Sequence, residues 1–341
     1  MKSAEWPKWL KSSFWGDYLS RNYVVGVDLG GTKILTAVAD RQGSVLSRVR
    51  VATGADLGQD HVINEIVTSV AVALREAGVS TEAVAAAGIG VPGPLDPQTG
   101  VVYLAPNLGW QNLSLGEILG SRLKLPVYVD NDANLAALGE CVYGAGQSAD
   151  NLVYITVSTG VGGGLILGGK IYHGFSGGAG EIGHITLAAD GPRCGCGNLG
   201  CLEALASGTA IAKRAVALVA EGRGLGILSR AGGDRGGVSA RVVAAAASNG
   251  DGEAILIMRD AGRYLGMAVA GILNLLNPSV VVLGGGVMQS GSILWEAMLE
   301  TTRRCALSSA LQEVSIVRAA LGEEAGVMGA LALALEKSQG V

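Results

Sequence analysis

Asp28-Leu29-Gly30-Gly31-Thr32-Lys33 stands between two short apolar runs, at 23–28 and 34–39, and this arrangement decides the fold. A turn at 40–43 leads into a third run at 44–51, so the pattern predicts three antiparallel strands. Glycines in such a turn let backbone N–H groups approach a phosphate without clashes from Cβ atoms. The turn is therefore a candidate phosphate-binding loop, with an ordinary hairpin as the alternative. Its candidate ligands are Asp28, Gly30, Gly31, Thr32 and Lys33, and Asp28 is also a candidate ligand for Mg²⁺.

The same unit occurs a second time in the chain. An apolar run at 152–157, a turn that begins at Ser158, and a second run at 161–167 match the first unit. This internal repeat predicts two related lobes that face one cleft. The second turn adds further candidate phosphate ligands, Ser158, Thr159, Gly160 and Gly162.

The remaining periodicity completes an α/β pattern with a predominantly helical C-terminal third. Helical spacing covers 61–77, 113–123, 207–219, 239–247, 253–276 and 323–336, and buried strands are expected at 85–91, 126–129 and 279–283. We expect an N-terminal extension at 1–22, a smaller lobe at 23–129 that the C-terminal helix at about 320–338 joins, and a larger lobe at 130–319.

Carboxylates and amides gather at Asp130-Asn131-Asp132-Ala133-Asn134, where a strand ends and a helix begins. Phosphoryl transfer needs a carboxylate that accepts the proton of the attacking hydroxyl. Asp132 is the candidate base and Asn131 a candidate partner for the substrate. Helix capping is the structural alternative, and both roles are compatible.

A metal site is the strongest local prediction. His184, Cys194, Cys196 and Cys201 are separated by glycines and offer one imidazole and three thiolates, which suit tetrahedral Zn²⁺. Because all four positions are protein ligands, we expect a structural zinc in the loop at 184–201. The loop would bring Glu181 and Glu203 to the same place, where carboxylates and an imidazole suit a polyhydroxylated ligand; surface carboxylates are the alternative.

Composition narrows the class of protein. The 341 residues favour two domains, and 49% hydrophobic residues supply a core. The net charge of −4 without a basic run argues against nucleic-acid binding. The longest apolar stretch, at 265–276, is too short to span a bilayer, and no signal peptide precedes the first strand. We therefore expect a cytoplasmic protein without a membrane partner.

Taken together, the glycine turns, the 130–134 cluster, the Glu181–His184 motif, the cysteine loop and Leu283–Gly286 resemble the ROK (repressor, open reading frame, kinase) family of sugar kinases. The resemblance runs from about Tyr23 to the C-terminus. It implies an actin-like, ribonuclease-H-like α/β fold of two lobes, with the active site in the cleft between them. It also implies ATP as phosphate donor, since the polyphosphate-using branch generally lacks the cysteine loop, and a homodimer or homotetramer.

The resemblance assigns roles to individual residues. It implies that Asp132 is the catalytic base and that Gly284 and Gly285 lie against the adenosine. It also implies that His184 serves both zinc and sugar. The implied sugar contacts are Gly93, Asn107, Asn131, Asp132, Glu181, His184 and Glu203.

The segment 107–110 resembles glucokinases of this family, so the expected reaction is phosphorylation of the 6-hydroxyl of glucose by ATP. Kinases of N-acetylmannosamine, mannose, fructose or allose would share the same site residues. A non-catalytic sugar-sensing regulator is the alternative from another class. Repressors of the family carry an N-terminal winged helix-turn-helix domain, for which the residues before the first strand are too few. The tryptophans of the 1–22 extension have no role in this pattern.

Overall fold

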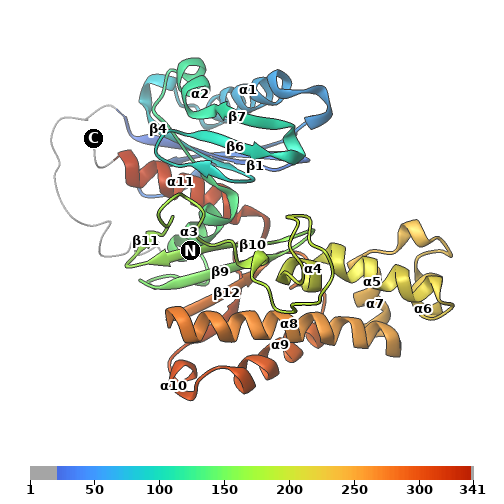
Figure 1. Cartoon of the computed structure of the whole chain (residues 1–341). Coiled ribbons are helices and arrows are strands. Elements are labelled where there is room, and N and C mark those ends of the chain that lie inside the picture. Colours follow the sequence, from blue (N-terminus) through green and yellow to red (C-terminus); the bar gives the residue numbers. More distant parts are fainter. Residues whose placement is uncertain (1–20, 339–341) are drawn as a thin grey trace. The chain divides into compact units, whose positions relative to one another are not determined.

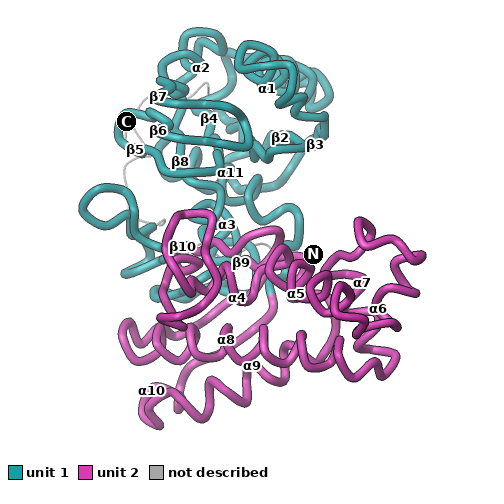
Figure 2. Tube along the Cα trace, turned by 45° about the vertical axis from the view of Figure 1, so that its right-hand side comes forward, with its two compact units in different colours: residues 1–154, 164–180, 319–341 teal, residues 155–163, 181–318 magenta. Residues whose placement is uncertain are grey.

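The computed structural model describes residues 21–338 (Figure 1), so the predicted extension at 1–22 lies almost entirely outside the described residues. The chain divides into two compact units (Figure 2). Unit 1 comprises residues 1–154, 164–180 and 319–341, and unit 2 comprises residues 155–163 and 181–318. The predicted lobe boundary after residue 129 stays a prediction; the two units differ from it by grouping residues 130–154 with unit 1.

Unit 1 is built on a five-stranded sheet in the order β3-β2-β1-β4-β8. Strands β1, β2 and β3 are antiparallel, which confirms the three strands predicted around the first glycine turn. Strand β4 runs parallel to β1, and β8 runs parallel to β4. The strands are β1 (Tyr23–Leu29), β2 (Lys33–Asp40), β3 (Val45–Ala52), β4 (Val84–Val91) and β8 (Val127–Asn131).

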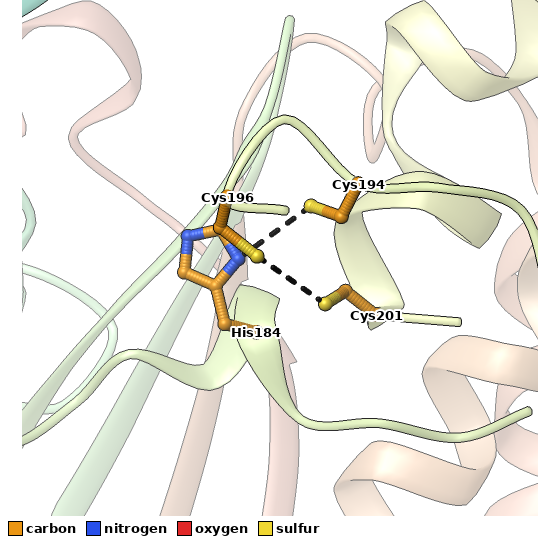
Figure 3. A group of neighbouring side chains, drawn as sticks. All are labelled: His184, Cys194, Cys196 and Cys201. Atoms are coloured by element: carbon orange, nitrogen blue, oxygen red, sulfur yellow. Dashed lines mark hydrogen bonds between the residues drawn. The ribbon is translucent and has the colours of Figure 1, made fainter. Parts of the chain in front are cut away.

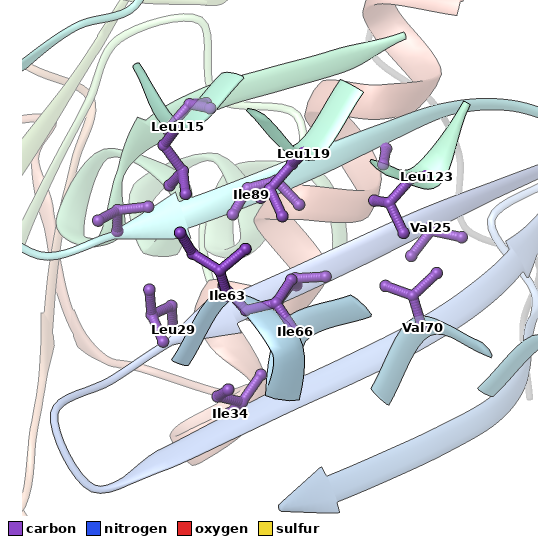
Figure 4. Packing of buried hydrophobic residues seen from close by; sticks show 14 of the residues in the cluster. Val25, Leu29, Ile34, Ile63, Ile66, Val70, Ile89, Leu115, Leu119 and Leu123 are labelled. Carbon is purple, nitrogen blue, oxygen red and sulfur yellow. The ribbon is translucent and has the colours of Figure 1, made fainter. Parts of the chain in front are cut away.

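Both faces of this sheet are covered by helices. Val25 and Leu29 of β1 pack toward α1 (Gln59–Ala77) and α2 (Leu115–Leu123), as Figure 4 shows. Val24, whose side chain points to the opposite face, packs against α11 (Ala325–Ser338). Burial on both faces of β1 explains why residues 23–27 form a continuous run without charged residues, rather than alternating with polar ones.

Helix α11 lies unusually close to its neighbours because glycines face it. A Cβ atom on Gly88 of β4 would lie 2.1 Å from the carbonyl oxygen of Ala330. On the other side, a Cβ atom on Gly329 would lie 1.7 Å from the carbonyl oxygen of Leu135 in α3 (Asp132–Tyr143). Helix α11 is therefore packed between the sheet and α3.

A small sheet completes unit 1. It consists of β5 (Leu95–Asp96), β6 (Val101–Ala105) and β7 (Trp110–Ser114), in the order β5-β6-β7. The helix predicted at 113–123 begins only at Leu115, because the preceding residues pair with β6 as strand β7.

The second five-stranded sheet has the order β11-β10-β9-β12-β13. It matches the first sheet, since three strands joined by short turns precede two strands that follow helices, and β12 and β13 are parallel. Its strands are β9 (Leu152–Val157), β10 (Val161–Leu167), β11 (Lys170–Ile171), β12 (Val280–Gly284) and β13 (Ser315–Arg318). The predicted repeat of the strand–glycine turn–strand unit is thus confirmed.

Strand β11 belongs to unit 1, and the part of unit 2 outside the second sheet is mainly helical. Helices α8 and α9 pack along each other, and α4, α5 and α7 contact α8. The helices are α4 (Leu202–Ala206), α5 (Gly208–Ala220), α6 (Leu225–Arg230), α7 (Ala240–Ser248), α8 (Gly252–Leu276), α9 (Ser292–Cys305) and α10 (Ser308–Leu311). Within residues 21–338, no helix is both long enough and apolar enough to cross a lipid bilayer.

Candidate active site

The first glycine turn joins β1 to β2 in unit 1. The backbone N–H of Gly30 donates to the carbonyl oxygen of Lys33 at 2.9 Å, and the Thr53 hydroxyl donates to the carbonyl oxygen of Gly30 at 2.7 Å. Thr32 is exposed at the tip, and its carbonyl oxygen accepts from the N–H of Thr53 at 3.1 Å. Thr53, which directly follows β3, therefore holds the turn in place, and the tip of the turn stays exposed.

The cation of this turn is engaged within unit 1. Lys33 Nζ lies 2.6 Å from Glu323 Oε2, and Arg50 lies 3.2 Å from the same oxygen. Lys33 lowers the pKa of the Glu323 carboxyl, which stays ionised. An incoming phosphate would meet two cations already gathered around one carboxylate.

Asp28, at the end of β1, has an unusual environment for a carboxylate. Burial raises its pKa to about 6, an effect that the charge of Lys33 partly opposes. A Cβ atom on Gly326 would lie 2.6 Å from the Asp28 carboxyl carbon, so the carboxylate lies against the start of α11. A divalent cation at this carboxylate would favour its ionised form, which suits the predicted role in holding Mg²⁺.

The predicted base stands at the first position of α3. The Asn131 side chain caps this helix by accepting from the N–H groups of Ala133 at 2.9 Å and Asn134 at 3.3 Å, so the capping alternative is correct for Asn131. Asp132 Oδ1 accepts from the N–H of Ala133 at 2.9 Å. Capping fixes the backbone that presents Asp132, and it does not prevent the carboxylate from accepting a proton.

Two further predicted sugar contacts lie beside these residues in unit 1. Asn131 Nδ2 donates to the carbonyl oxygen of Gly93 at 3.2 Å. Asn107, in a short 3₁₀ turn, borders the first glycine turn, because a Cβ atom on Gly31 would lie 3.5 Å from the Asn107 Cβ. Unit 1 therefore gathers Gly93 with Asn131 and Asp132, and Asn107 with the glycine turn.

The sequence did not reveal one contact at this strand end. Asp130 is 2% exposed, and its Oδ2 lies 2.7 Å from His173 Nε2. The hydrogen bond to Asp130 raises the pKa of His173. His173 carries no local motif, and only the pairing of β10 with β11 brings it to β8.

The second glycine turn joins β9 to β10. The N–H of Ser158 donates to the carbonyl oxygen of Gly160 at 2.9 Å, and the N–H and hydroxyl of Thr209 donate to the carbonyl oxygen of Thr159 at 3.3 and 2.8 Å. The turn is thereby attached to the N-terminal end of α5, while Gly162 lies within β10. The N–H groups of Gly208, Thr209 and Ala210 already have partners, so an anion at this end of α5 would be favoured mainly by the dipole of the helix.

The glycines after β12 lie against the second turn. Gly284 is the last residue of β12, and Gly285 has a φ of 89°. A Cβ atom on Gly285 would lie 2.3 Å from the carbonyl oxygen of Val157, so only glycine permits this approach. The 283–286 segment therefore lies directly beside the 158–160 turn in unit 2.

A cavity of about 1050 Å³ opens beside these two segments. Ser158, Thr159 and Gly286 line it together with residues that the sequence analysis missed, Thr209, Lys213, Arg235 and Arg241. The cavity is polar at the glycine turn and carries three cations, which suits a nucleotide with charged phosphates. The predicted helix at 207–219 corresponds to α5, and the hydroxyl of Ser207, which caps α5, accepts from the N–H of Ala210 at 3.1 Å.

The four predicted metal ligands converge in unit 2 (Figure 3). Their ligand atoms lie within 4.8 Å of one another; Cys194 Sγ is 3.7 Å from His184 Nδ1, and Cys196 Sγ is 3.7 Å from Cys201 Sγ. Zn–S bonds of about 2.3 Å in a tetrahedron separate ligand atoms by about 3.7 Å. The donor set and its spacing therefore fit a four-coordinate cation such as Zn²⁺.

The protonation of the thiols depends on such a cation. Burial raises the pKa of Cys194 and raises that of Cys201 to about 12, whereas the N–H of Asn198 lowers the pKa of Cys196. Two of the three thiols would keep their protons near neutral pH unless a cation displaced them.

The predicted sugar-binding residues of unit 2 surround this cluster. His184 Nε2 lies 3.9 Å from Glu181 Oε2, while its Nδ1 faces Cys194. Glu203 accepts from the N–H of Val161 through Oε2 at 3.0 Å, and its Oε1 lies 3.7 Å from Cys194 Sγ. Glu203 therefore links the cysteine loop to the second glycine turn.

Comparisons with known proteins agree with this arrangement. The ROK family model matches residues 24–337. The chain is 38% identical over 313 residues to the glucokinase of Halalkalibacterium halodurans, covering 91% of this chain and 94% of the relative. Among solved structures, a ROK hexokinase from Thermus thermophilus shares 40% identity at a TM-score of 0.81, covering 94% of this chain and 100% of that one.

A second solved structure was determined with ligands. It is a ROK family glucokinase from Streptomyces griseus in complex with glucose and AMPPNP, 36% identical at a TM-score of 0.77, covering 92% of this chain and 99% of that one. The match confirms the predicted actin-like α/β fold. The ROK family model covers nearly all the described residues, and a glucokinase that aligns over almost its whole length is 38% identical to the chain. This chain therefore belongs to the ROK family.

Proposed function

We propose that this chain is an ATP-dependent hexose kinase that phosphorylates the 6-hydroxyl of glucose. The observation that carries the proposal is the Asp132 carboxylate, presented by a capped helix beside Asn131, whose amide is bonded to Gly93. The similarity to glucokinases, one of them solved with glucose and AMPPNP, supports the choice of sugar and of ATP.

The reaction needs little covalent chemistry from the protein. The sugar hydroxyl attacks the γ-phosphorus, its proton passes to Asp132, and the bond from the γ-phosphorus to the β,γ-bridging oxygen breaks to release ADP. Asn131, Gly93 and Asn107 in unit 1, and Glu181, His184 and Glu203 in unit 2, would hold the sugar hydroxyls. Closure of the predicted lobes over the sugar would bring these two sets together and exclude water.

The nucleotide would be held by the two glycine turns. Gly30, Gly31, Thr32 and Lys33 would contact phosphates from unit 1, and Ser158, Thr159, Gly160 and Gly162 from unit 2. The cavity lined by Ser158 and Gly286 is the proposed place of the nucleoside, beside Gly284 and Gly285.

Two metal ions belong to this proposal. Asp28 would hold Mg²⁺, which neutralises charge on the phosphates. His184, Cys194, Cys196 and Cys201 would hold a structural Zn²⁺, which orders the 184–201 loop and thereby places His184 and Glu203. We further propose a homodimer or homotetramer in the cytoplasm that uses neither nucleic acid nor membrane.

The test is ADP release by the purified protein with ATP, Mg²⁺ and a panel of hexoses and N-acetylhexosamines. We expect the highest kcat/KM with glucose. A higher value with N-acetylmannosamine, mannose, fructose or allose would reassign the sugar. Sugar binding by calorimetry without ADP release from any member of the panel would refute the kinase and favour a sugar-sensing regulator.

A further inference from the structure

A buried carboxylate stands directly before the residues proposed to act on the sugar. Asp130 is 2% exposed at the end of β8, and both of its oxygens have partners. Oδ1 accepts from the backbone N–H of Asn131 at 2.8 Å and from Asn134 Nδ2 at 3.0 Å. Oδ2 lies 2.7 Å from His173 Nε2. Asp130 is thus the centre of a network that includes its own strand end, α3 and the segment after β11.

The network reaches the proposed base through the backbone. Asn131 and Asn134 both donate hydrogen bonds to Asp130. They lie on either side of Asp132 in the sequence, at the start of α3. Asn131 also bonds Gly93, a proposed sugar contact. A shift of the Asp130 carboxylate would therefore move the peptide that carries Asp132.

His173 is the only one of these partners that comes from a distant segment and can change its charge near neutral pH. Its side chain is 31% exposed, so the ring exchanges protons with solvent while its Nε2 stays on Asp130. His173 begins a loop at 173–179, which is closed by a hydrogen bond from the N–H of Ala179 to the carbonyl oxygen of His173 at 3.1 Å. This loop leads directly to Glu181.

Charged groups from three elements face this pair. The hydrogen bond to Asp130 of β8 raises the pKa of His173, and partial burial of the ring opposes this effect. Lys337 of α11 also lowers this pKa, and Glu336 of α11 raises it. Burial raises the pKa of Glu336 itself, and the charge of Lys170 in β11 partly opposes this shift. The net effect raises the pKa of His173, so the imidazole beside the Asp130 carboxylate keeps its proton to a higher pH than an ordinary histidine does.

We propose that His173 is a positioning residue for phosphoryl transfer, which holds Asp130 and through it sets Asn131 and Asp132 against the sugar hydroxyl. The proposal rests on the proposed kinase function. A charge-assisted hydrogen bond is roughly twice as strong as a neutral one, so the strand end is held most firmly while the imidazole is protonated. Loss of that proton at high pH weakens the bond, and kcat falls on the alkaline side of the profile.

The experiment compares kcat, KM for glucose and ATP, and the pH dependence of kcat in wild type, His173→Ala, His173→Gln and the control His61→Gln. A misplaced catalytic group costs up to about 100-fold, so we expect His173→Ala to lower kcat by about 10- to 100-fold with smaller changes in both KM values. His173→Gln keeps a donor without a titrating charge. It should regain most of the kcat at neutral pH and lose the alkaline decline, while His61→Gln behaves as wild type.

The result that overturns the proposal is a wild-type kcat and an unchanged alkaline limb in both His173 variants. If His173→Ala fails to fold, the pH profile of His173→Gln decides alone. Histidine NMR titration separates this inference from the kinase proposal. The His173 pKa should lie above the usual value in wild type and fall in Asp130→Asn. An ordinary wild-type value in an active kinase refutes this inference alone, and a wild type that phosphorylates no sugar refutes both proposals.

Discussion

At the scale of single residues, the proposed chemistry depends on the surroundings of two aspartate carboxylates, Asp132 and Asp28. Asp132 is at the first turn of α3, where the helix dipole and the N–H of Ala133, which donates to Asp132 Oδ1, favour a negative charge. Asp28 instead lies in a buried place that penalises its charge. The two aspartates thus lie in different environments, and we propose Asp132 as the base and Asp28 as the cation ligand.

Asp132→Asn removes the proton acceptor and keeps the size of the side chain. General base catalysis contributes about 10²- to 10⁴-fold, so we expect kcat to fall by that factor while glucose still binds with near wild-type affinity. Steady-state kinetics and calorimetry measure both quantities. Asp60→Asn, at an exposed position in the first turn of α1, is the control. Near-normal turnover of Asp132→Asn would remove this residue from the role of base.

Asp28→Asn should stabilise the protein at neutral pH although it harms activity. The folded-state pKa of about 6 exceeds the ordinary value of 3.8, so the ionised carboxylate costs stability above pH 6 and the cost disappears as pH falls below about 4. One pKa unit corresponds to about 1.4 kcal/mol, so the gain at pH 7 is up to about 3 kcal/mol. Urea unfolding at pH 7 and pH 4 measures it. A gain that is equal at both pH values would contradict the burial of this charge.

The residues that the sequence revealed are those whose partners are close in the chain. The three cysteines and His184 span one loop, and the Asp130–Asn134 cluster occupies one turn. His173, Lys213, Arg235 and Arg241 come from segments that only the folded chain brings to the sites. No spacing rule links these four residues, so the sequence alone does not reveal them.

At the scale of elements, strong periodicity made most strands and long helices predictable. The predictions missed short or weakly patterned elements such as the 3₁₀ turn that carries Asn107, the small sheet β5-β6-β7, and β13, whose residues are mostly half-buried or exposed. Helix α9 was missed although it is 14 residues long, because polar residues interrupt its apolar face. These elements form because tertiary partners exist, which a local pattern does not report.

The cysteine loop should lose its order when the cation is removed. We expect chelation, or Cys196→Ser, to lower the thermal midpoint and raise the KM for glucose, because the loop places His184 and Glu203. Cys305→Ser, at an exposed position in α9 of the same unit, is the control and should change neither. Zinc content by elemental analysis accompanies both measurements. A metal-free protein with full activity and an unchanged midpoint would contradict the structural role.

Adding a single methyl group where α3 contacts α11 should lower the stability of the protein. In Gly329→Ala the Cβ would lie 1.7 Å from the Leu135 carbonyl oxygen, and overpacking of this kind costs about 1–3 kcal/mol. Gly271→Ala in α8 has no atom within 4 Å of the new Cβ, so it should instead stabilise by about 0.5–1 kcal/mol. Urea unfolding compares them. Equal effects of the two substitutions would show that α11 is not packed this closely.

At the scale of the whole molecule, the two five-stranded sheets share one strand order. Each carries a glycine turn between its first two antiparallel strands, and the two turns belong to different units. The repeat was visible in the sequence because both turns depend on glycine at matching points. Helix α3, which follows the predicted lobe boundary at residue 129, packs with α11 from the far end of the chain.

The most direct test of the proposed kinase is the identity of its product. Glucose labelled with ¹³C at C6 is incubated with ATP, Mg²⁺ and the purified protein, and the product is observed by ¹³C and ³¹P NMR. We expect a phosphate ester with ¹³C–³¹P coupling at C6, formed together with ADP and lost in Asp132→Asn. Phosphate on the anomeric oxygen, or ADP formed with inorganic phosphate and unmodified glucose, would contradict it.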